Sequence, residues 1–533
     1  MRVKEGRLIN SSAPLKFTFD DKEFLGCEGD TLASALIAND VKVIGRSFKY
    51  HRPRGVMTDG SQEPNGLVEI RDGNQTTPNV RLTTQELVPD LRVYSQNYWG
   101  TLKWDLLELN DLISPFLAAG FYYKTFMWPK KFWEALYEPS IRRAAGLGRL
   151  SMANNSDYYE KAYAFCDVLV IGSGPAGIMA ALTAANAGAK VIFCEEDSVF
   201  GGRLNSENYD IDGKPGDIWA REKIDQLNQM DNVRCMSRTT VTGAYDGGTY
   251  GAVERISHHI KEKNHTLPVE IFWRIVAKGA VYAAGSIERS IAFQNNDRPG
   301  VFTASAMRGY LNRYGVSLGK KAVIFGNNND AFRTAKDLHS NGIEIAAYVD
   351  SRSDATIQGD FPVFKGAMVT NVRGRMGVKE VEVTQTNGSV SKIETSMLGV
   401  SGGWNPTVHL TCHMNGKPEW NDQLAAFIPV PGMIPGLEVA GAATGVFSTK
   451  GCMKSGVFRA KEVLKNLGLS YKTTSVPEAE SDPTVIVPLW TVPCKGRSWI
   501  DFQNDVTVKD IKQSAEENFK SVEHMKRYTT QGM

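Results

Sequence analysis

The chain has 533 residues, of which 42% are hydrophobic and 23% are charged, and its formal net charge at pH 7 is +2. This composition is typical of a globular protein with enough apolar residues for about three domains. The nearly balanced charge gives no overall field that would select nucleic acid or an anionic membrane surface, so we expect neither as a partner.

The seven cysteines are widely spaced and include no C-x-x-C pair, which favours a reducing compartment over a disulfide-stapled secreted fold. No signal-peptide pattern is present at the N-terminus. The most apolar window, LISPFLAAGFYY at 112–123, is shorter than the ~20 residues of a membrane span. We therefore predict a cytoplasmic protein.

Residues 1–96 predict a small β-rich domain. The stretch LKFTFDDKEFLGCEGDTLASALIAND alternates apolar and polar residues, turns at Asp20-Asp21 and enters a helix behind Asp30 or Thr31, which indicates a ββα start. Two later strand-like runs, GLVEI and VRLTTQEL, complete a domain of the size of a ferredoxin-like β-grasp domain.

Residues 97–160 predict an aromatic helical linker. Aromatic residues recur there at helical spacing: Trp99, Trp104, Phe116, Phe121, Tyr122, Tyr123, Phe126, Trp128, Phe132, Trp133 and Tyr137. Packing inside the protein would explain this density. So would a surface that docks another subunit, because aromatic residues are enriched at interface centres.

The loop GRSFKYHRPRG at 45–55 is strongly basic. It is either a solvated loop or an anion site, for example for a flavin phosphate or an acidic partner surface. We expect this loop and the aromatic segment 97–137 to face partner subunits or their flavin, because no ligand within the chain explains their charge and aromatic density.

From Phe165 the sequence changes to alternating strands and helices. The stretch FCDVLVIGSGPAGIMAALTAANAGAKVIFCEE has the layout of a dinucleotide-binding βαβ unit, and KKAVIFGNNNDAFRTAKDLHSNGIEIAAYVD repeats that layout. We predict an α/β fold with two nested Rossmann-like domains of the FAD/NAD-linked reductase type. The first spans 161–300 and 400–470, the second, degenerate one spans 301–399, and a Pro-rich linker with a terminal helix follows in 471–533.

The first unit has all three glycines of G-x-G-x-x-G. Gly172 permits a tight turn, Gly174 lets the backbone approach a pyrophosphate, and Gly177 lets helix and strand pack closely, while the helix N-terminus attracts the phosphates. Glu195, at the end of the second strand, can accept both ribose hydroxyls of an adenosine. A 2′-phosphate is not tolerated beside Glu195 and Glu196, so NAD or FAD is favoured over NADP. A vestigial unit without a ligand is the alternative.

The second unit keeps only Gly326 of the three glycines. The polar side chains from Asn327 to Asp330 cap a helix well, but they crowd the place of a pyrophosphate, and Asp330 repels it. We expect this second site to be empty and Asp330→Ala to change nothing measurable. Asp350 follows the next strand, so the fold itself is expected to be retained.

Two further stretches contain small residues near the ends of strands, SVFGGRL at 198–204 and GLEVAGAATGVFSTKG at 436–451. In two-dinucleotide flavoproteins such segments close over one ligand, which would place it between Gly172 and Ala442; ordinary turns are the alternative. The stretch HLTCH at 409–413 puts two histidines on one helix face, but no further ligand supports a metal site. We assign no metal-binding and no catalytic residue.

Several stretches together resemble the large alpha subunit of heterotetrameric sarcosine oxidase: GDTLASALIANDVKVIGRSFKYHRPRG, DVLVIGSGPAGIMAA, SGGWNPTVHL, and VPLWTVP with DFQNDVTVKDI. The resemblance implies a flavoenzyme complex that oxidatively demethylates sarcosine to glycine with hydrogen peroxide, the one-carbon unit going to tetrahydrofolate or formaldehyde. It implies NAD in the first loop of this chain, FMN at the interface with a partner subunit, and FAD in the partner. The beta, gamma and delta subunits are then the partners, and the isolated chain is expected to be inactive.

Carried over by residue, the resemblance implies these NAD contacts: Ala176, Glu195, Glu196, Arg203, Val241, Ala442, Phe447 and Thr449. The N-terminal segment resembles ferredoxin-like domains of amine and opine oxidases, in which cysteines at C-x₄-C-x₂-C spacing hold a [2Fe–2S] cluster. The corresponding loop, YHRPRGVMTDG, lacks cysteine, so no cluster is expected. Family members continue into an aminomethyltransferase-like folate domain, whereas this sequence stops at Met533, as a fragment or a shortened variant with a truncated C-terminal domain.

Two other functions stay open at this stage. One is a self-sufficient FAD-dependent NAD(P)H oxidoreductase, which would hold flavin in the isolated chain. The other is a subunit of a related opine or proline dehydrogenase complex, because the substrate specificity resides outside this chain.

Overall fold

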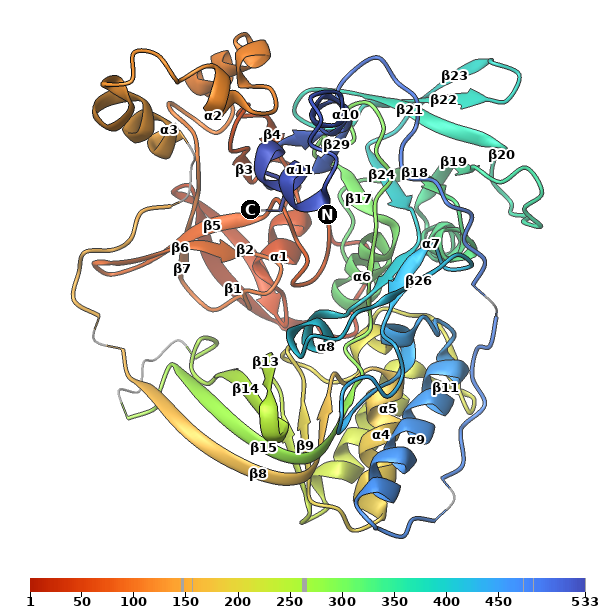
Figure 1. Cartoon of the computed structure of the whole chain (residues 1–533). Coiled ribbons are helices and arrows are strands. Elements are labelled where there is room, and N and C mark those ends of the chain that lie inside the picture. Colours follow the sequence, from red (N-terminus) through yellow and green to blue (C-terminus); the bar gives the residue numbers. More distant parts are fainter. Residues whose placement is uncertain (145–147, 156, 261–265, 473, 483, 533) are drawn as a thin grey trace. The chain divides into compact units, whose positions relative to one another are not determined.

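The computed structural model describes residues 1–144, 148–155, 157–260, 266–472, 474–482 and 484–532. Two compact units make up the chain, and the chain passes between them repeatedly (Figure 1). Unit 1 consists of 1–155, 290–402 and 488–533, and unit 2 of 156–289 and 403–487. Among the described residues, no helix combines the length and the apolar character that crossing a membrane requires.

The N-terminal part of unit 1 is a five-stranded sheet of order β2-β1-β7-β5-β6 with helix α1. Asp20 and Asp21 form the β1–β2 turn with positive φ, a conformation that aspartate tolerates better than most residues. Thr31 caps α1 in a capping box with Ser34. These elements are β1 (Asn10–Phe19), β2 (Lys22–Glu28), α1 (Leu32–Ala38), β3 (Gly45–Arg46), β4 (Pro53–Arg54), β5 (Leu67–Asp72), β6 (Gln75–Arg81) and β7 (Leu91–Ser95).

A parallel five-stranded sheet of order β17-β24-β18-β19-β20 forms the Rossmann-like part of unit 1. A three-stranded antiparallel sheet, β21-β22-β23, accompanies it. The elements are β17 (Val301–Thr303), α6 (Ala304–Tyr314), β18 (Lys321–Gly326), α7 (Asn329–Ser340), β19 (Glu344–Asp350), β20 (Val363–Lys365), β21 (Ala367–Arg373), β22 (Glu380–Gln385), β23 (Val390–Glu394) and β24 (Met397–Ser401).

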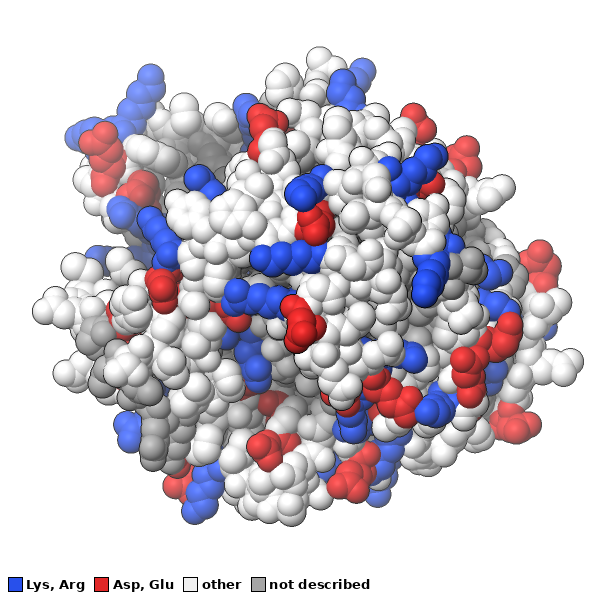
Figure 2. All heavy atoms as spheres, turned by 90° about the horizontal axis from the view of Figure 1, so that it is seen from below, with Lys and Arg blue, Asp and Glu red and all other residues white. Residues whose placement is uncertain are grey.

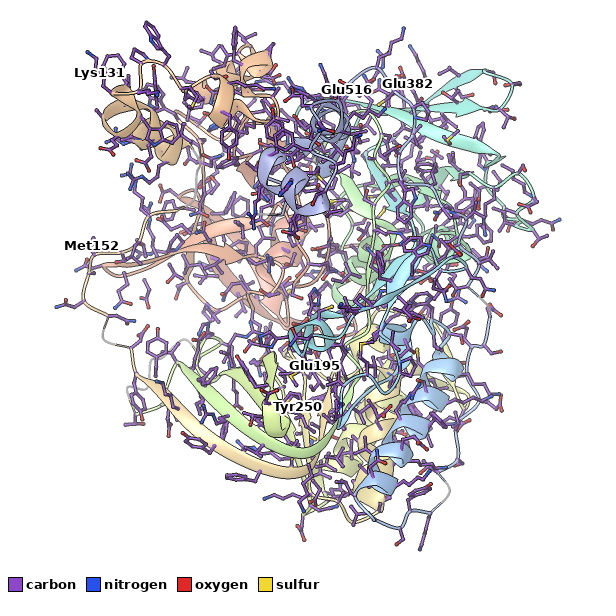
Figure 3. All side chains as sticks on the ribbon, in the orientation of Figure 1. Lys131, Met152, Glu195, Tyr250, Glu382 and Glu516 are labelled. Carbon is purple, nitrogen blue, oxygen red and sulfur yellow. The ribbon has the colours of Figure 1, made fainter. Side chains whose placement is uncertain are left out.

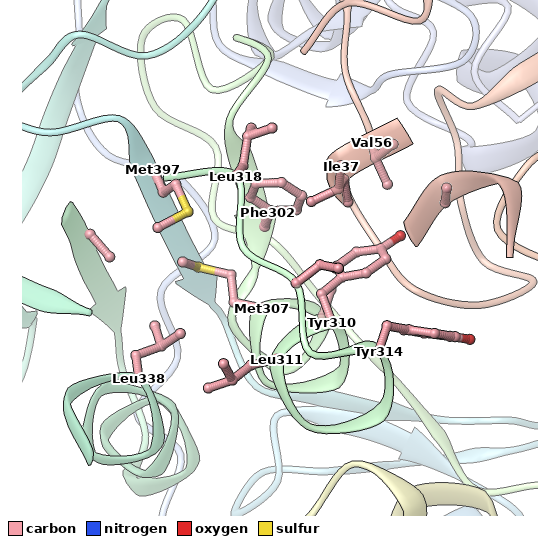
Figure 4. Packing of buried hydrophobic residues seen from close by; sticks show 14 of the residues in the cluster. Ile37, Val56, Phe302, Met307, Tyr310, Leu311, Tyr314, Leu318, Leu338 and Met397 are labelled. Carbon is pink, nitrogen blue, oxygen red and sulfur yellow. The ribbon is translucent and has the colours of Figure 1, made fainter. Parts of the chain in front are cut away.

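The two parts of unit 1 share one hydrophobic core. Met307 and Tyr310 of α6 lie in the same buried cluster as Ile37 of α1 and the neighbouring Val56 (Figure 4). The hydroxyl of Tyr310 also donates to the backbone oxygen of Thr58 at 2.7 Å. The β-grasp domain is therefore packed onto the degenerate Rossmann domain as one body, because burying this apolar surface is favourable.

Unit 2 is built on a seven-stranded sheet in which β8 and β9 are parallel neighbours and β28 pairs with β15. Helices α4 and α9 pack on each other through the buried cluster that also includes β8 and β9. The main elements are β8 (Tyr159–Ile171), α4 (Pro175–Asn186), β9 (Val191–Cys194), α5 (Gly216–Asn228), β12 (Val233–Met236), β13 (Thr239–Tyr245), β14 (Thr249–Arg255), β15 (Glu270–Tyr282), β28 (Leu437–Val439) and α9 (Thr449–Asn466).

Shorter elements complete both units. Unit 2 adds η4 (Gly202–Asn205), β10 (Asp210–Ile211), β11 (Lys214–Pro215), η5 (Asp246–Gly248), β16 (Ser286–Glu288), β25 (Trp404–Pro406), α8 (His409–His413), β26 (Glu419–Asn421), β27 (Ala426–Ile428) and η6 (Gly441–Thr444). Unit 1 adds η1 (Leu106–Asp111), η2 (Ser114–Leu117), α2 (Phe121–Lys124), η3 (Trp133–Tyr137), α3 (Glu138–Ala144), β29 (Trp499–Asp501), β30 (Val506–Thr507), α10 (Val508–Glu516) and α11 (Val522–Thr529). On the face shown in Figure 2, acidic and basic side chains are interspersed.

The basic loop 45–55 is buried inside unit 1, which corrects the expectation that it faces a partner or a flavin. Arg52 Nε donates to Asp505 Oδ1 at 2.6 Å, although Asp505 lies 453 residues further along the chain. The guanidinium groups of Arg52 and Arg54 both donate to the backbone oxygen of Phe502, at 2.6 and 2.8 Å. The loop thus finds its anionic partner in the C-terminal segment of its own unit, because a buried cation needs a nearby carboxylate.

Candidate functional site

The first glycine loop joins β8 to α4 in unit 2. Gly172 has a φ of 93°, and a Cβ on it would lie 2.6 Å from the oxygen of Ala283. A Cβ on Gly177 would lie 1.8 Å from the oxygen of Gly172. Gly174 differs, because its φ is −66° and a Cβ there would meet nothing within 4 Å. The fold itself thus requires the outer two glycines, whereas the middle one borders open space.

The N-terminus of α4 is the helix end that faces this space. No described side chain caps it, and Pro175 occupies its first turn, so the first amides and the helix dipole are available to an anion. The N-terminus of α9 differs, because the Glu480 carboxylate accepts from the Thr449 amide at 3.0 Å. Of these two helices, α4 is therefore the one suited to a pyrophosphate.

Glu195, labelled in Figure 3, lies directly after β9, and its carboxylate is hydrogen-bonded to Ser173 of the glycine loop. Its Oε2 accepts from the amide and the hydroxyl of Ser173, at 2.9 and 2.5 Å, and its Oε1 accepts from the amide of Asp197 at 2.9 Å. Burial raises the pKa of Glu195 to about 7, although these hydrogen bonds favour its charged form. The carboxylate that a ribose would need is therefore held beside the phosphate loop.

Two distant stretches of sequence close on the loop. A Cβ on Gly202 would lie 3.1 Å from the amide nitrogen of Gly174, and one on Gly441 would lie 2.7 Å from the Cβ of Ala176. A Cβ on Gly456 of α9 would lie 2.0 Å from the oxygen of Ala176. These close approaches leave little room for side chains at Gly202, Gly441 and Gly456, whereas the side towards which a Cβ of Gly174 would point stays open.

The other expected contact residues are distributed around this centre. Arg203 in η4 forms an ion pair with Glu207 and lies 4.9 Å from the ring of Trp404. Phe447 and Trp404 share a small buried cluster, against which Ala442 packs. These side chains link η4 to the segment after β28.

Val241 and Glu196 belong to the strand side of the site. Val241 is in β13, two residues after Thr239, whose amide donates to the backbone oxygen of Glu195 at 2.7 Å. The side chain of Glu196 is exposed, and its backbone oxygen accepts from Arg255 at 2.8 Å. Of the two neighbouring glutamates, only Glu195 is hydrogen-bonded to the glycine loop in the contacts described above.

The sequence analysis did not identify three residues that shape this site. Ser173, inside the motif, fixes the Glu195 carboxylate; a hydroxyl between the first two glycines was its only signal. Trp404 stands in the quoted stretch SGGWNPTVHL, but nothing in that stretch indicated its contact with Arg203. Glu480 lies in the Pro-rich linker, and only the folded chain shows that it caps α9.

Binding of a dinucleotide at this site is expected to strengthen as the pH rises. Ribose hydroxyls donate to an ionised carboxylate, and burial raises the pKa of Glu195 to about 7 in the free chain. The dissociation constant should therefore fall about tenfold between about pH 6 and 8. Calorimetric titration between about pH 6 and 8 measures the dissociation constant. Glu195→Gln should remove the dependence, and Glu195→Ala should weaken binding by ~1–3 kcal/mol; an equally steep dependence in Glu195→Gln would contradict the assignment.

The same raised pKa affects the stability of the free chain. The folded-state pKa of Glu195 lies above the ordinary carboxyl value. The stabilisation that its protonated form gives to the folded state is therefore fully present at acid pH and is lost as the pH rises towards about 7. Binding reverses this trend, since the ligand's hydroxyls favour the charged form.

The second loop, in unit 1, is filled by its own side chains. Asn328 caps α7 by accepting from the amides of Asp330 and Ala331, at 3.0 and 3.2 Å, and its amide group donates to Ser401 Oγ at 2.9 Å. At the end of β19, Asp350 accepts from Arg352 at 2.9 and 2.8 Å. The positions that a pyrophosphate and a ribose carboxylate would use are therefore engaged within the chain.

Asp330 has a role that the sequence analysis did not recognise. Its Oδ2 accepts from Arg308 at 3.0 Å, and both side chains are buried. Asp330→Ala is therefore expected to lower the free energy of unfolding by ~1–3 kcal/mol, which corrects the expectation of no measurable effect. Chemical denaturation measures this loss, and dinucleotide titration should show unchanged binding. A fully stable Asp330→Ala variant would contradict the ion pair.

The fold is that of FAD/NAD-linked oxidoreductases, with two Rossmann-like sheets. Residues 167–254 match the model of FAD dependent oxidoreductases, residues 12–98 match a 2Fe-2S iron-sulfur cluster binding domain, and residues 495–533 match the sarcosine oxidase A3 domain. The predicted fold class, two Rossmann-like domains behind a ferredoxin-like domain, is thereby confirmed.

The curated relatives specify the family. The chain is 47% identical over its full length to sarcosine oxidase subunit alpha of Rhizobium meliloti (strain 1021), covering 54% of that protein. It is 30% identical over 98% of its length to the same subunit of Corynebacterium sp. (strain P-1), covering 52% of it. The chain therefore belongs to the family of sarcosine oxidase alpha subunits, and it spans about half the length of these relatives.

A solved structure supports the fold over almost the whole chain. L-proline dehydrogenase from P. horikoshii matches with a TM-score of 0.64 and 20% identity, over 99% of this chain and 89% of that one. At this level of identity the likeness concerns the fold alone.

The residues of the N-terminal domain do not fit an iron–sulfur cluster. Cys27 is the single cysteine between residues 12 and 98, whereas such clusters are held by several cysteine thiolates. The buried carboxylate of Glu63 organises the loop before β5 instead. It accepts from the amides of Met57, Thr58 and Asn65 at 2.9, 2.6 and 2.8 Å.

Proposed function

We propose that the chain is the NAD-binding alpha subunit of a multi-subunit flavoenzyme that oxidises sarcosine. The observation that carries the proposal is the contrast between the loops. The first leaves space at Gly174 beside Glu195, and the second is filled by the side chain of Asn328, which caps α7 and donates to Ser401. A single dinucleotide per chain fits this contrast, and the relation to sarcosine oxidase alpha subunits supports the substrate.

In this proposal the residues of the chain bind and orient the dinucleotide. The amides at the start of α4 hold the pyrophosphate. Glu195 accepts hydrogen bonds from the ribose hydroxyls after the Ser173 hydroxyl releases Oε2 of the Glu195 carboxylate. Ala176, Arg203, Val241, Ala442, Phe447 and Thr449 are the proposed surrounding contacts. NAD, when bound, either supplies a redox-active nicotinamide or acts as a purely structural ligand.

The oxidation of the substrate is assigned to partner subunits. Sarcosine, oxygen and water give glycine, formaldehyde and hydrogen peroxide, or the one-carbon unit passes to tetrahydrofolate. The proposed cofactors for these steps are FAD in the beta subunit and FMN at its interface with this chain, with gamma and delta subunits completing the complex. Burial raises the pKa of Cys166 to about 12 and that of Cys452 to about 12, so these thiols are poor nucleophiles.

The alternative of a self-sufficient NAD(P)H oxidoreductase requires two dinucleotides in one chain. The filled second loop argues against it, because Asn328 and Asp350 already use their polar atoms within the fold. The other alternative is a subunit of an opine or proline dehydrogenase complex. The substrate that the partner subunit oxidises distinguishes this alternative from the proposed function.

Nucleotide extraction from the purified chain tests the proposal. We expect NAD at one equivalent per chain, no visible flavin absorption, and no oxidation of sarcosine by the chain alone. With the beta, gamma and delta subunits added, sarcosine should yield hydrogen peroxide. Flavin released from the isolated chain would overturn the NAD assignment, and a complex that oxidises only another amine would overturn the substrate.

A further inference from the structure

Unit 1 carries a dense group of exposed apolar side chains in residues 99–144 and 148–152, called here the apolar segment. The side chains of Leu112, Trp128 and Met152 are 78%, 81% and 91% exposed. Others that are exposed are Trp99, Trp104, Leu106, Leu109, Phe116, Tyr123, Met127, Leu136 and Leu150. The side chain of Tyr122 lies outside the described part. So many exposed large apolar side chains in one segment are typical of an interaction site in soluble proteins.

The apolar segment is attached to the rest of unit 1 by polar contacts and by a stacked pair of aromatic rings. Lys124 forms an ion pair with Glu517 at 2.5 Å, and Asp111 forms one with Arg497. Tyr123 stacks on Tyr528 with ring centroids 6.3 Å apart. The fold therefore holds the backbone of the segment in place while most of its large apolar side chains contact solvent.

A basic groove adjoins the apolar segment. It has a volume of about 1030 Å³, and its lining includes Arg71, Arg142, Arg143 and Arg149 with Tyr94 and Tyr98. Arg71 is paired with Glu69 and Arg142 with Glu138. Lys131 and Met152, labelled in Figure 3, belong to the same segment. Between residues 112 and 152 the basic residues outnumber Glu134 and Glu138, the only acidic ones.

We propose that the apolar segment and the basic groove form the docking site for a different subunit of the flavoenzyme. That subunit presents an apolar face with an aspartate- and glutamate-rich rim, since charge complementarity across the rim fixes partner and orientation. A second copy of this chain fits less well, because an isologous interface would bring the same basic residues from both copies into one contact region. The inference rests on the proposed function, which supplies the beta subunit as the partner.

Co-purification with the beta subunit, each chain carrying a different tag, tests the apolar part. The double variant Leu112→Ser, Trp128→Ser should lower the affinity by about tenfold or more, since central apolar anchors dominate interfaces. The matched control Tyr163→Ser, Phe458→Ser removes apolar side chains of unit 2 that are 65% and 55% exposed, and it should bind normally. Both variants should unfold at the temperature of the parent chain and keep NAD, which separates docking from folding.

Charge reversal tests the groove. Arg143→Glu, Arg149→Glu should weaken the complex and reduce the salt dependence of its dissociation constant, whereas Lys454→Glu on α9 should leave both unchanged. Normal binding by the apolar and the charge-reversed variants would overturn the docking site while the proposed function stands. If the parent chain forms no complex with the beta subunit, the docking site and the proposed function both fail. If the apolar variant abolishes self-association of the chain instead, the occupant is a second copy and the proposal is wrong.

Discussion

Replacing Asp505 by alanine is expected to lower the free energy of unfolding of unit 1 by ~3–5 kcal/mol. The change leaves the Arg52 guanidinium, which also lies 3.3 Å from Asp297, without its 2.6 Å partner in a buried setting. It also removes the acceptor of the Lys49 and Tyr50 amides, at 2.7 and 3.2 Å. A buried cation that loses its carboxylate retains its desolvation cost, which is why removing one partner costs more than the pair contributes.

Denaturant unfolding followed by tryptophan fluorescence measures this loss. Trp499 is a suitable reporter, because the Arg52 guanidinium lies 4.4 Å from its ring. Glu523→Ala is the matched control: it removes a carboxylate from a surface pair with Lys526 at 3.6 Å and should cost less than ~1 kcal/mol. Equal stability of the two variants would show that the Arg52–Asp505 pair does not hold the C-terminal segment.

The same pair makes unit 1 sensitive to acid. Burial alone would raise the pKa of Asp505, but Arg52 and Arg54 hold it below the ordinary carboxyl value. The stabilisation is therefore present above that ordinary value, ~3.9, and is lost as the pH falls through the lower folded-state pKa. In Asp505→Asn the decline in stability at acid pH should be shallower than in the parent chain.

Replacing Gly174 by leucine is expected to weaken dinucleotide binding strongly without unfolding the chain. A Cβ on Gly174 meets nothing within 4 Å, so the free protein accommodates the side chain in solvent. A bound pyrophosphate would meet that side chain, at a cost of ~1–3 kcal/mol or more for overpacking, which is a ~10–100-fold or greater loss of affinity. Calorimetric titration with NAD measures the loss.

Gly177→Leu is the informative comparison in the same loop. Its Cβ would lie 1.8 Å from the oxygen of Gly172, so this variant should fail to fold, whereas Gly174→Leu should melt like the parent chain. Tight NAD binding by Gly174→Leu would place the pyrophosphate elsewhere. A folded Gly177→Leu variant would show that α4 and β8 are less closely packed than the structure indicates.

Local sequence signals carried most of the successful predictions. Gly172, Gly174 and Gly177 lie within six residues of one another, so the sequence alone identified the loop, the helix α4 and the strand β9, which ends just before Glu195. The ββα start was equally local, because the turn at Asp20-Asp21 and its flanking strands are contiguous. All the predicted NAD contacts, within this loop and outside it, remain predictions.

Contacts between distant residues were not predictable from local pattern. The sequence pattern showed no internal counter-ion for the basic loop 45–55, because Asp505 is 453 residues away from Arg52. Asp330 looked like a repulsive charge at an empty site, yet Arg308, on the preceding helix α6, neutralises it. In both cases the sequence showed a charge but not the partner that the fold brings to it.

The order of the chain has a consequence for its synthesis on the ribosome. Unit 2 ends at residue 487, so all of it has been translated before Asp505 is made. At ~5–20 residues per second, the 453 residues between Arg52 and Asp505 take about 20–90 s to translate. Throughout that interval Arg52 lacks its 2.6 Å partner Asp505, and Asp297, at 3.3 Å, is the one of these two carboxylates that is made before the interval ends. Nascent chains released early would complete unit 2 yet expose this loop, a difference that a protease or a chaperone can recognise.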